Sequence, residues 1–291
     1  MQKSKFRYFI EIAKPGIVAS NMLTTIAGYF LAAGWHFDFL LFFSSIIGIM
    51  LIVAAACVFN NLIDRDIDIV MARTKNRVSL DKQYPPSVAL IYGVILVSIG
   101  FVILWLGTNL FSALLAIFGF IIYVGIYSLI FKRRSIHGTL IGALSGAIPP
   151  VVGYTAVTNQ FDAIALLLYL TLVLWQMPHF YAIAIYRFDD YKAANIRVRP
   201  VVCGFLDTKI HMICYATALL CITIFLGFAA HLTIIYKIAM AICGAIFVVL
   251  CRQGFDTKDN TRWARRVFIF SIIEITVFSV SVLLSVQNLP I

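Results

Sequence analysis

Nine long apolar runs dominate this chain of 291 residues. A helix needs about 20 consecutive apolar residues to cross a membrane, and each run is long enough to do so. The runs cover approximately residues 15–34, 39–59, 88–107, 111–131, 139–158, 162–184, 210–230, 232–251 and 267–287. Because backbone groups in lipid must be hydrogen-bonded within the protein, the runs predict an all-α integral membrane protein with nine transmembrane helices.

The composition also favours a membrane protein over a soluble one. Hydrophobic residues make up 62% of the chain and charged residues 12%, whereas a soluble domain carries about 25% charged residues. No polar stretch is long enough for a separate soluble domain, so we expect residues 1–291 to form one transmembrane domain. The net charge of +10 does not indicate nucleic-acid binding, because the basic residues lie in short loops between apolar runs.

The positions of lysine and arginine predict the orientation of the chain. All but one of the 23 basic residues lie before the first run or in every second loop, and the exception is Lys237. Basic loops favour the cytoplasmic side of a membrane. We therefore expect the N-terminus and the two longest loops, 60–87 and 185–209, in the cytoplasm, with any active site at that end of the bundle.

Three polar residues follow the second apolar run at four-residue spacing: Asn60, Asp64 and Asp68. Residues four apart lie on one face of a helix, while Asp66 falls on another face. Two carboxylates and an amide on one stripe form an oxygen-rich site that suits Mg²⁺ or Mn²⁺. The alternative interpretation is a loop whose charges are only solvated.

A basic cluster follows directly, with Arg73, Lys75 and Arg77 at two-residue spacing. Mg²⁺ bridges carboxylate and phosphate oxygens, and an arginine binds phosphate oxygens with two parallel hydrogen bonds. Together with the carboxylates, this cluster predicts a site for a metal-bound diphosphate.

The second long loop has its own charged cluster, which includes Arg187 and Asp190. These residues predict either a second half of the diphosphate site or a solvated loop, and the sequence favours neither.

Polar side chains also occur inside the sixth apolar run. Trp175, Gln176 and His179 lie near its end, and Pro178 is expected to break the helix and free backbone carbonyls. Polar groups at membrane depth face the interior of the bundle or a wet cavity. The alternative for His179 is a packed residue that bonds a freed carbonyl. In the fifth run, the small and proline residues of 145–150 predict close helix packing or, less favoured, a cavity wall.

These motifs resemble the UbiA superfamily of intramembrane prenyltransferases, in which N-x-x-x-D-x-x-x-D follows the second of nine spans. Four further blocks resemble its haem-farnesylating branch: R-T-K-N-R at 73–77, Y-S-L-I-F-K-R at 127–133, the G-T-L-I-G-A-L-S-G-A-I-P-P-V-V-G-Y run at 138–154 and W-Q-M-P-H-F at 175–180. The resemblance covers approximately residues 10–275. Many members carry a second D-x-x-x-D where this chain has Tyr186–Asp190, so a complete second metal site is not implied.

The resemblance implies a bundle with a central cavity, open to the cytoplasm and to lipid, in the inner (plasma) membrane of a bacterium. It implies transfer of a farnesyl group from farnesyl diphosphate to a vinyl group of haem B. Addition of water would then give haem O, with release of diphosphate. Haem O would serve a terminal oxidase, directly or after conversion by a haem A synthase.

The resemblance also implies roles for the residues singled out above. Asn60, Asp64 and Asp68 would hold Mg²⁺, with Asp190 as a further candidate ligand. His179 would orient haem or act as a base in water addition. The remaining candidates would bind diphosphate (Arg73, Lys75, Arg77 and Arg187) or haem (Trp175 and Gln176).

Two other functions fit part of the pattern. The first keeps the chemistry but uses a quinone-precursor ring as the acceptor. The second is an anion transporter with Asp64, Asp68 and Arg73 along its pathway. Transporters often show an inverted repeat and broken helices at mid-membrane depth. This chain has no convincing repeat, and its charges cluster at one face.

Overall fold

The computed structural model describes residues 5–80 and 84–286. Lys3 and Lys82, two of the residues used to predict orientation, lie outside these ranges. Within them the chain forms helices and turns without a β-strand, and nine helical segments are long and apolar enough to cross a membrane. The prediction of an all-α fold with nine spans is confirmed.

Several spans are single helices and others are composite. In chain order they are α2 (Pro15–Ala33), α3 (Phe39–Ile63), α5 (Pro86–Gly107), α6 (Leu110–Ile121) continued by the π-helix η2 (Ile122–Phe131) and α7 (Lys132–Arg134), α8 (Gly138–Gly146) with α9 (Ile148–Thr158), α10 (Ala163–Tyr186), α12 (Arg199–Ala229), α13 (Ile234–Arg252) with η3 (Gln253–Phe255), and α14 (Asn260–Ser285).

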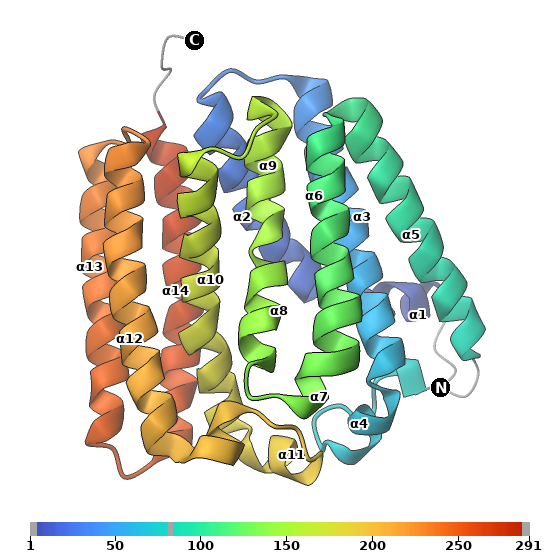
Figure 1. Cartoon of the computed structure of the whole chain (residues 1–291), viewed down its shortest axis with the longest axis vertical. Coiled ribbons are helices and arrows are strands. Elements are labelled where there is room, and N and C mark those ends of the chain that lie inside the picture. Colours follow the sequence, from blue (N-terminus) through green and yellow to red (C-terminus); the bar gives the residue numbers. More distant parts are fainter. Residues whose placement is uncertain (1–4, 81–83, 287–291) are drawn as a thin grey trace.

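Four short helices lie outside the spans: α1 (Lys5–Ile12), α4 (Arg65–Val70), η1 (Val78–Leu80) and α11 (Phe188–Ala193). The two longest loops contain α4 and α11, which lie at the same end of the bundle (Figure 1). An apolar cluster joins these loops, with Ile67 and Met71 from one and Ile196 from the other. The two loops therefore form one structure over that end.

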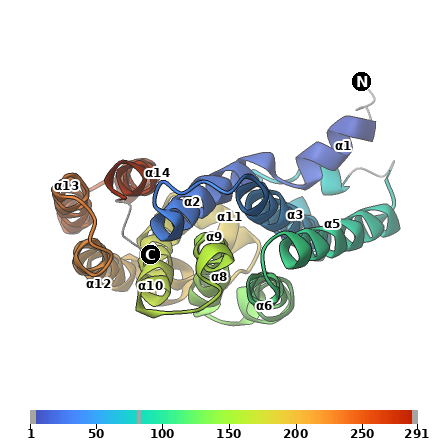
Figure 2. The same cartoon turned by 90° about the horizontal axis from the view of Figure 1, so that it is seen from above.

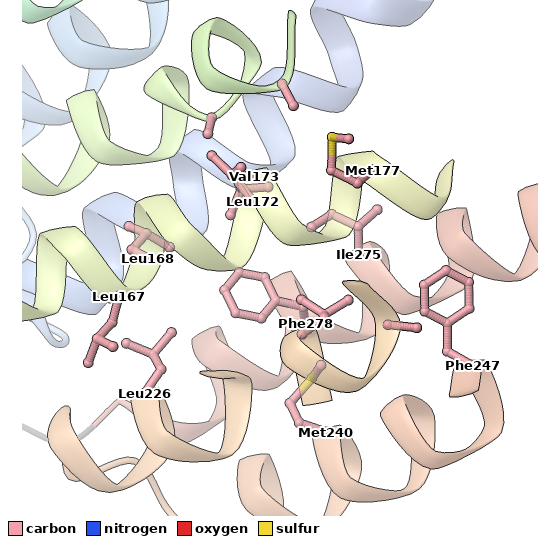
Figure 3. Close-up of a cluster of buried hydrophobic side chains, with 14 of the residues drawn as sticks. Leu167, Leu168, Leu172, Val173, Met177, Leu226, Met240, Phe247, Ile275 and Phe278 are labelled. Atoms are coloured by element: carbon pink, nitrogen blue, oxygen red, sulfur yellow. The ribbon is translucent and has the colours of Figure 1, made fainter. Parts of the chain in front are cut away.

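The spans pack as a bundle in which α3 runs along α5, α2 along α9, and α10 against both α12 and α14. Seen from above, α12, α13 and α14 form one side, while α5 and α6 lie at the opposite side (Figure 2). The largest core cluster joins the C-terminal helices to α10 (Figure 3), and its members include Leu168, Leu172, Leu226, Met240 and Phe278. Such van der Waals packing holds helices together where lipid removes the usual hydrophobic driving force.

Two helices begin earlier than the apolar pattern predicts. Helix α12 begins at Arg199 rather than near residue 210, and a kink at Gly204, with φ of 82°, interrupts its first turns. Across this kink Arg199 Nε donates to Asp207 Oδ2 at 2.5 Å. Helix α14 begins at Asn260 because the Asp259 side chain accepts from the third backbone amide after it. A search for apolar runs misses such polar helical turns.

The predicted helix break at Pro178 is wrong, because α10 continues through this residue without interruption. A proline inside a helix removes one N–H bond and crowds the carbonyl four residues earlier, but packing against neighbouring helices holds the segment helical. The break occurs instead at Ala147, between α8 and α9. Pro149 lies in the first turn of α9, where a missing N–H costs nothing.

Two glycines allow helices α2 and α9 to approach each other closely. A Cβ atom on Gly28 of α2 would lie 1.9 Å from the carbonyl oxygen of Pro150 in α9. A Cβ atom on Gly153 of α9 would lie 2.3 Å from the carbonyl oxygen of Thr25. Glycine therefore allows the two backbones to touch, as small residues do at membrane helix interfaces.

Replacing Gly28 tests this packing. We expect Gly28→Ala to destabilise the bundle by about 1–3 kcal/mol, because the methyl group meets backbone that cannot rotate away. Gly16→Ala, near the start of the same helix, is the matched control, since nothing lies within 4 Å of its added methyl group. Thermal unfolding in detergent measures both variants. Equal midpoints would contradict the proposed close contact.

Candidate active site

A cavity of about 570 Å³ lies inside the bundle, within the range of about 300–1,000 Å³ typical of small-molecule sites. Its apolar walls come from α3, α6, α9 and α10, and Ile49, Val53, Phe120, Ile148 and Leu172 are among the side chains that line them. Polar side chains from the spans and from both long loops complete the lining. The cavity therefore joins an apolar interior to a charged region.

Asn60, Asp64 and Asp68 all line this cavity and are buried. Asp64 lies at the junction of α3 and α4, and backbone hydrogen bonds of 3.0 and 2.8 Å continue the helical turn through it. The four-residue spacing thus places the three side chains on one face, as predicted. Asp66 points elsewhere and binds Arg133 at 2.6 Å. That hydrogen bond lowers the pKa of Asp66.

Each member of this stripe is bound to a cation from another part of the chain. Lys14 Nζ donates to Asn60 Oδ1 at 2.7 Å, and Lys132 donates to Asp64 Oδ2. Arg77 donates to both carboxylate oxygens of Asp68 at 2.8 Å. The other oxygen of Asp64, Oδ1, is buried without a hydrogen-bond partner among the described residues.

The sequence interpretation missed Lys14 and Lys132. Neither was assigned to the site, although Lys132 lies in the block at 127–133, because the two lysines lie 46 and 68 residues from their partners. Burial lowers the pKa of Lys14 to about 8. The signal in the sequence was weak: Lys14 and Lys132 each lie at the end of a predicted span.

The π-helix η2 fixes the orientation of the Asn60 amide. Ser128 donates to the carbonyl of Tyr123, five residues earlier, at 2.8 Å. Its oxygen therefore accepts from Asn60 Nδ2, at 3.2 Å. The amide oxygen then faces Lys14, which has only donors. The same helix turns Tyr123 and Tyr127 toward the cavity, consistent with the frequent location of π-helical turns at functional sites.

The basic cluster divides in the structure. Arg73 and Arg77 line the cavity, whereas Lys75 is exposed and does not. Arg187 and Asp190 also lie outside the cavity lining.

Asp190 has a structural contact instead of a place in the cavity. Its Oδ1 accepts from the backbone N–H of Ala72 at 3.2 Å and ties one long loop to the other. Tyr191 and Arg197 line the cavity from the second loop, and the sequence analysis did not select them. Burial raises the pKa of Tyr191, so its hydroxyl stays a neutral donor.

The oxygen atoms of Asn60, Asp64 and Asp68 suit a hard cation, but a bound phosphate or water must supply further oxygen ligands. No three His, Cys, Asp or Glu side chains gather into a metal site within residues 5–80 and 84–286. Mg²⁺ is commonly bound by one or two carboxylates, with phosphates and waters supplying the remaining oxygens. The free Oδ1 of Asp64 fits this arrangement.

A second wall of the cavity is formed by α10 and α14. Trp175, Gln176 and His179 line it, as their shared position in α10 predicted. His179 Nδ1 lies 2.7 Å from the Ser271 hydroxyl of α14. The Gln176 amide donates to the carbonyls of Ala143 and Leu172 at 3.2 and 3.1 Å.

Gln176 also faces the gap between α8 and α9. A Cβ atom on Gly146 would lie 2.2 Å from Gln176 Oε1, and Gly146 and Pro149 both line the cavity. The stretch 145–150 therefore both packs closely and forms cavity wall, so both predicted roles are observed.

Comparison with solved structures shows the fold. A structure of digeranylgeranylglyceryl phosphate synthase superposes with a TM-score of 0.81 at 17% identity, covering 98% of this chain and 99% of the other. A UbiA homologue from Archaeoglobus fulgidus bound to DMAPP and Mg²⁺ gives a TM-score of 0.74 at 13% identity, with 94% and 98% covered.

Sequence comparison gives nearer relatives. The protoheme IX farnesyltransferases of Enterobacter sp. (strain 638) and Yersinia pseudotuberculosis serotype O:1b (strain IP 31758) are each 46% identical to this chain, over 97% of it and 95% of the relative. The model of the UbiA prenyltransferase family matches residues 21–273. By this match over most of its length, the chain belongs to the UbiA prenyltransferase family.

Proposed function

We propose that this protein transfers the farnesyl group of farnesyl diphosphate to a vinyl group of haem B, with addition of water, to give haem O. The observation that carries the proposal is the 46% identity to protoheme IX farnesyltransferases over nearly the full length of both chains. The cavity supports it, because a cation-rich charged wall and an aromatic wall with a histidine face the same space.

The charged wall suits the diphosphate. Arg73, Arg77, Lys14 and Lys132 line it and would bind phosphate oxygens. When the bond between farnesyl C1 and the diphosphate oxygen breaks, the electron pair leaves with diphosphate, and negative charge develops there. Cations that are already in place stabilise this charge without further reorganisation.

A divalent ion would join the diphosphate to the carboxylates. The Archaeoglobus fulgidus homologue binds Mg²⁺ with DMAPP, a prenyl diphosphate. In this chain Asn60, Asp64 and Asp68 would hold the ion, and the unpartnered Oδ1 of Asp64 provides a free position for it. Mg²⁺ or Mn²⁺ would supply charge neutralisation for the leaving group. Asp190 is not placed in this set, because it lies outside the cavity lining and its Oδ1 accepts from the backbone of Ala72.

The apolar walls and the second wall suit the rest of the reaction. Breaking the C–O bond leaves allylic cation character on the farnesyl chain, and an apolar cavity keeps water from quenching it early. The π-electrons of the haem vinyl group form the new carbon–carbon bond to farnesyl C1. The cation left on the vinyl carbon then takes the oxygen of water, and one proton is released. Trp175, Gln176 and His179 would face the haem during this step.

The location follows from the same proposal. The basic residues of α4, α7 and α11 and of the loops beside them would face the cytoplasm, in the inner membrane of a bacterium. Farnesyl diphosphate would then enter from the cytoplasmic end. The product would pass to a terminal oxidase or to a haem A synthase.

Product analysis tests the function. The purified protein is incubated with radiolabelled farnesyl diphosphate and Mg²⁺, once with haem B and once with 4-hydroxybenzoate, and the products are separated by chromatography. We expect a farnesylated product with haem B only. A product with 4-hydroxybenzoate only would identify a quinone-precursor enzyme. No transfer to either acceptor, with diphosphate uptake into vesicles, would favour a transporter.

Asp64 tests the metal site. We expect Asp64→Asn to lower turnover by about 100-fold or more, because the metal that would neutralise the leaving diphosphate loses a ligand, and lost stabilisation of developing charge has this effect in other enzymes. Asp66→Asn is the matched control, since Asp66 lies two residues away but binds Arg133 outside the cavity. Turnover is measured at several Mg²⁺ concentrations and with EDTA. Full activity of Asp64→Asn in EDTA would exclude the metal model.

Arg77 tests diphosphate binding. Lysine keeps the positive charge beside Asp68 but loses the two-pronged guanidinium. We expect Arg77→Lys to raise the KM for farnesyl diphosphate by about tenfold, equivalent to one charge-assisted hydrogen bond. Lys75→Ala is the control and should leave this KM unchanged, because Lys75 is exposed outside the cavity. A larger effect of Lys75→Ala would contradict this assignment.

A further inference from the structure

Ser271 joins α14 to the histidine of the second wall. Its side chain is fully buried. Its hydroxyl oxygen lies 2.7 Å from His179 Nδ1 and 2.6 Å from the carbonyl oxygen of Phe268. Both distances are those of good hydrogen bonds. The hydroxyl therefore has two partners, and it has only one hydrogen atom to share between them.

The position of that hydrogen decides the state of the histidine ring. A carbonyl oxygen only accepts, so the hydroxyl must donate to Phe268, since two oxygens at 2.6 Å would otherwise repel each other. The hydroxyl oxygen is then left as an acceptor toward His179. The imidazole must supply the hydrogen for that bond, so Nδ1 carries the proton. In the neutral ring the lone pair is therefore on Nε2.

The surrounding rings hold the imidazole in this position. Trp175 stacks on His179, with ring centroids 4.9 Å apart and an angle of 28° between the planes. The Trp175 indole N–H donates to the backbone carbonyl of Ser271 at 2.7 Å. The Phe268 ring also contacts the imidazole, with ring centroids 5.0 Å apart. The ring is thus fixed by contacts with α14 as well as with its own helix.

Nε2 remains free. His179 lines the cavity, and no described residue makes a hydrogen bond to Nε2. We propose that Ser271 is a positioning residue, which holds His179 as the Nδ1–H tautomer and presents the Nε2 lone pair to the acceptor substrate. The proposal rests on the function proposed above. It extends that function because it states which nitrogen reacts and which residue selects it.

The lone pair has two uses in the reaction, and both need the same tautomer. Nε2 bonds the haem iron, or it accepts the proton that leaves water as the oxygen bonds the vinyl carbon. In the second case the O–H electron pair stays on oxygen and the imidazole becomes imidazolium. Proteins usually select a histidine tautomer in this way: a hydrogen bond made by one ring nitrogen leaves the lone pair on the other.

Nuclear magnetic resonance of ¹⁵N-histidine-labelled protein tests the tautomer without substrate. His179→Gln identifies the signals of His179 by their loss. We expect a protonated shift for Nδ1 and an unprotonated shift for Nε2 in the wild-type protein near pH 7. In Ser271→Ala we expect the Nε2–H form to increase, because Nδ1 loses its acceptor. The indole bond of Trp175 remains, since it goes to the backbone of residue 271. A wild-type signal with Nε2 protonated would overturn the proposal.

Turnover of the same variants tests the consequence. We expect Ser271→Ala to lower kcat by about 10- to 100-fold, with the KM for farnesyl diphosphate unchanged. Ser279→Ala is the matched control: this serine is also fully buried in α14, but among the described residues its hydroxyl bonds only the carbonyl of Ile275, at 2.9 Å. A change in the Soret band of haem B bound to Ser271→Ala would assign Nε2 to the iron, and an unchanged band to proton transfer.

Two results separate the failure of this proposal from failure of the function. Wild-type kcat in Ser271→Ala, in a protein that makes haem O, would overturn the role of Ser271 and leave the function intact. The predicted tautomer in a protein that makes no haem O would overturn the function, and with it the proposed use of Nε2.

Discussion

The site depends on the need to compensate buried carboxylates inside a membrane protein. Asp64 and Asp68 are buried inside the protein at one end of the bundle, and an unpaired buried charge is costly. Lys132 and Arg77 provide the compensation. Because these cations come from α7 and from the loop after α4, the ion pairs also fix the positions of those segments. The ion pairs that compensate the buried charges of Asp64 and Asp68 therefore also form the charged wall of the cavity.

The same ion pairs explain why the site is prepared for a charged ligand. Each cation already faces a cavity-lining oxygen, and each lies within reach of an anion that enters beside it. A metal–diphosphate brings both signs of charge, so it can take over both sets of partners at once. Beyond the charges, apolar side chains of α3, α6 and α9 line much of the cavity, and a prenyl chain would lie among them. Binding would thus replace the ion pairs within the protein by ion pairs with the metal–diphosphate, and no buried charge would be left unpaired.

The sequence predicted those parts of the structure that depend on local spacing. The nine spans follow from apolar length, and the face shared by Asn60 and Asp64 follows from helical periodicity. Lys14 could not be found in this way, because its partner lies 46 residues away and only the tertiary fold brings them together. Alternation grouped Lys75 with Arg73 and Arg77, but a loop has no fixed period, and the structure places Lys75 on the surface outside the cavity lining. A helix break was predicted at Pro178, but packing against neighbouring helices keeps α10 helical through this residue.

The second wall follows the same constraint at a smaller scale. A polar group buried among helices is costly without a hydrogen-bond partner, so the single hydroxyl hydrogen of Ser271 cannot be placed freely. Its use by the Phe268 carbonyl leaves only an acceptor for His179, and the ring responds by carrying its proton on Nδ1. Sequence alone left the tautomer of His179 open, because Ser271, which selects it, lies 92 positions away on another helix. In both walls a partner far away in the sequence compensates a buried polar group: Lys132 pairs with Asp64, and Ser271 fixes the tautomer of His179.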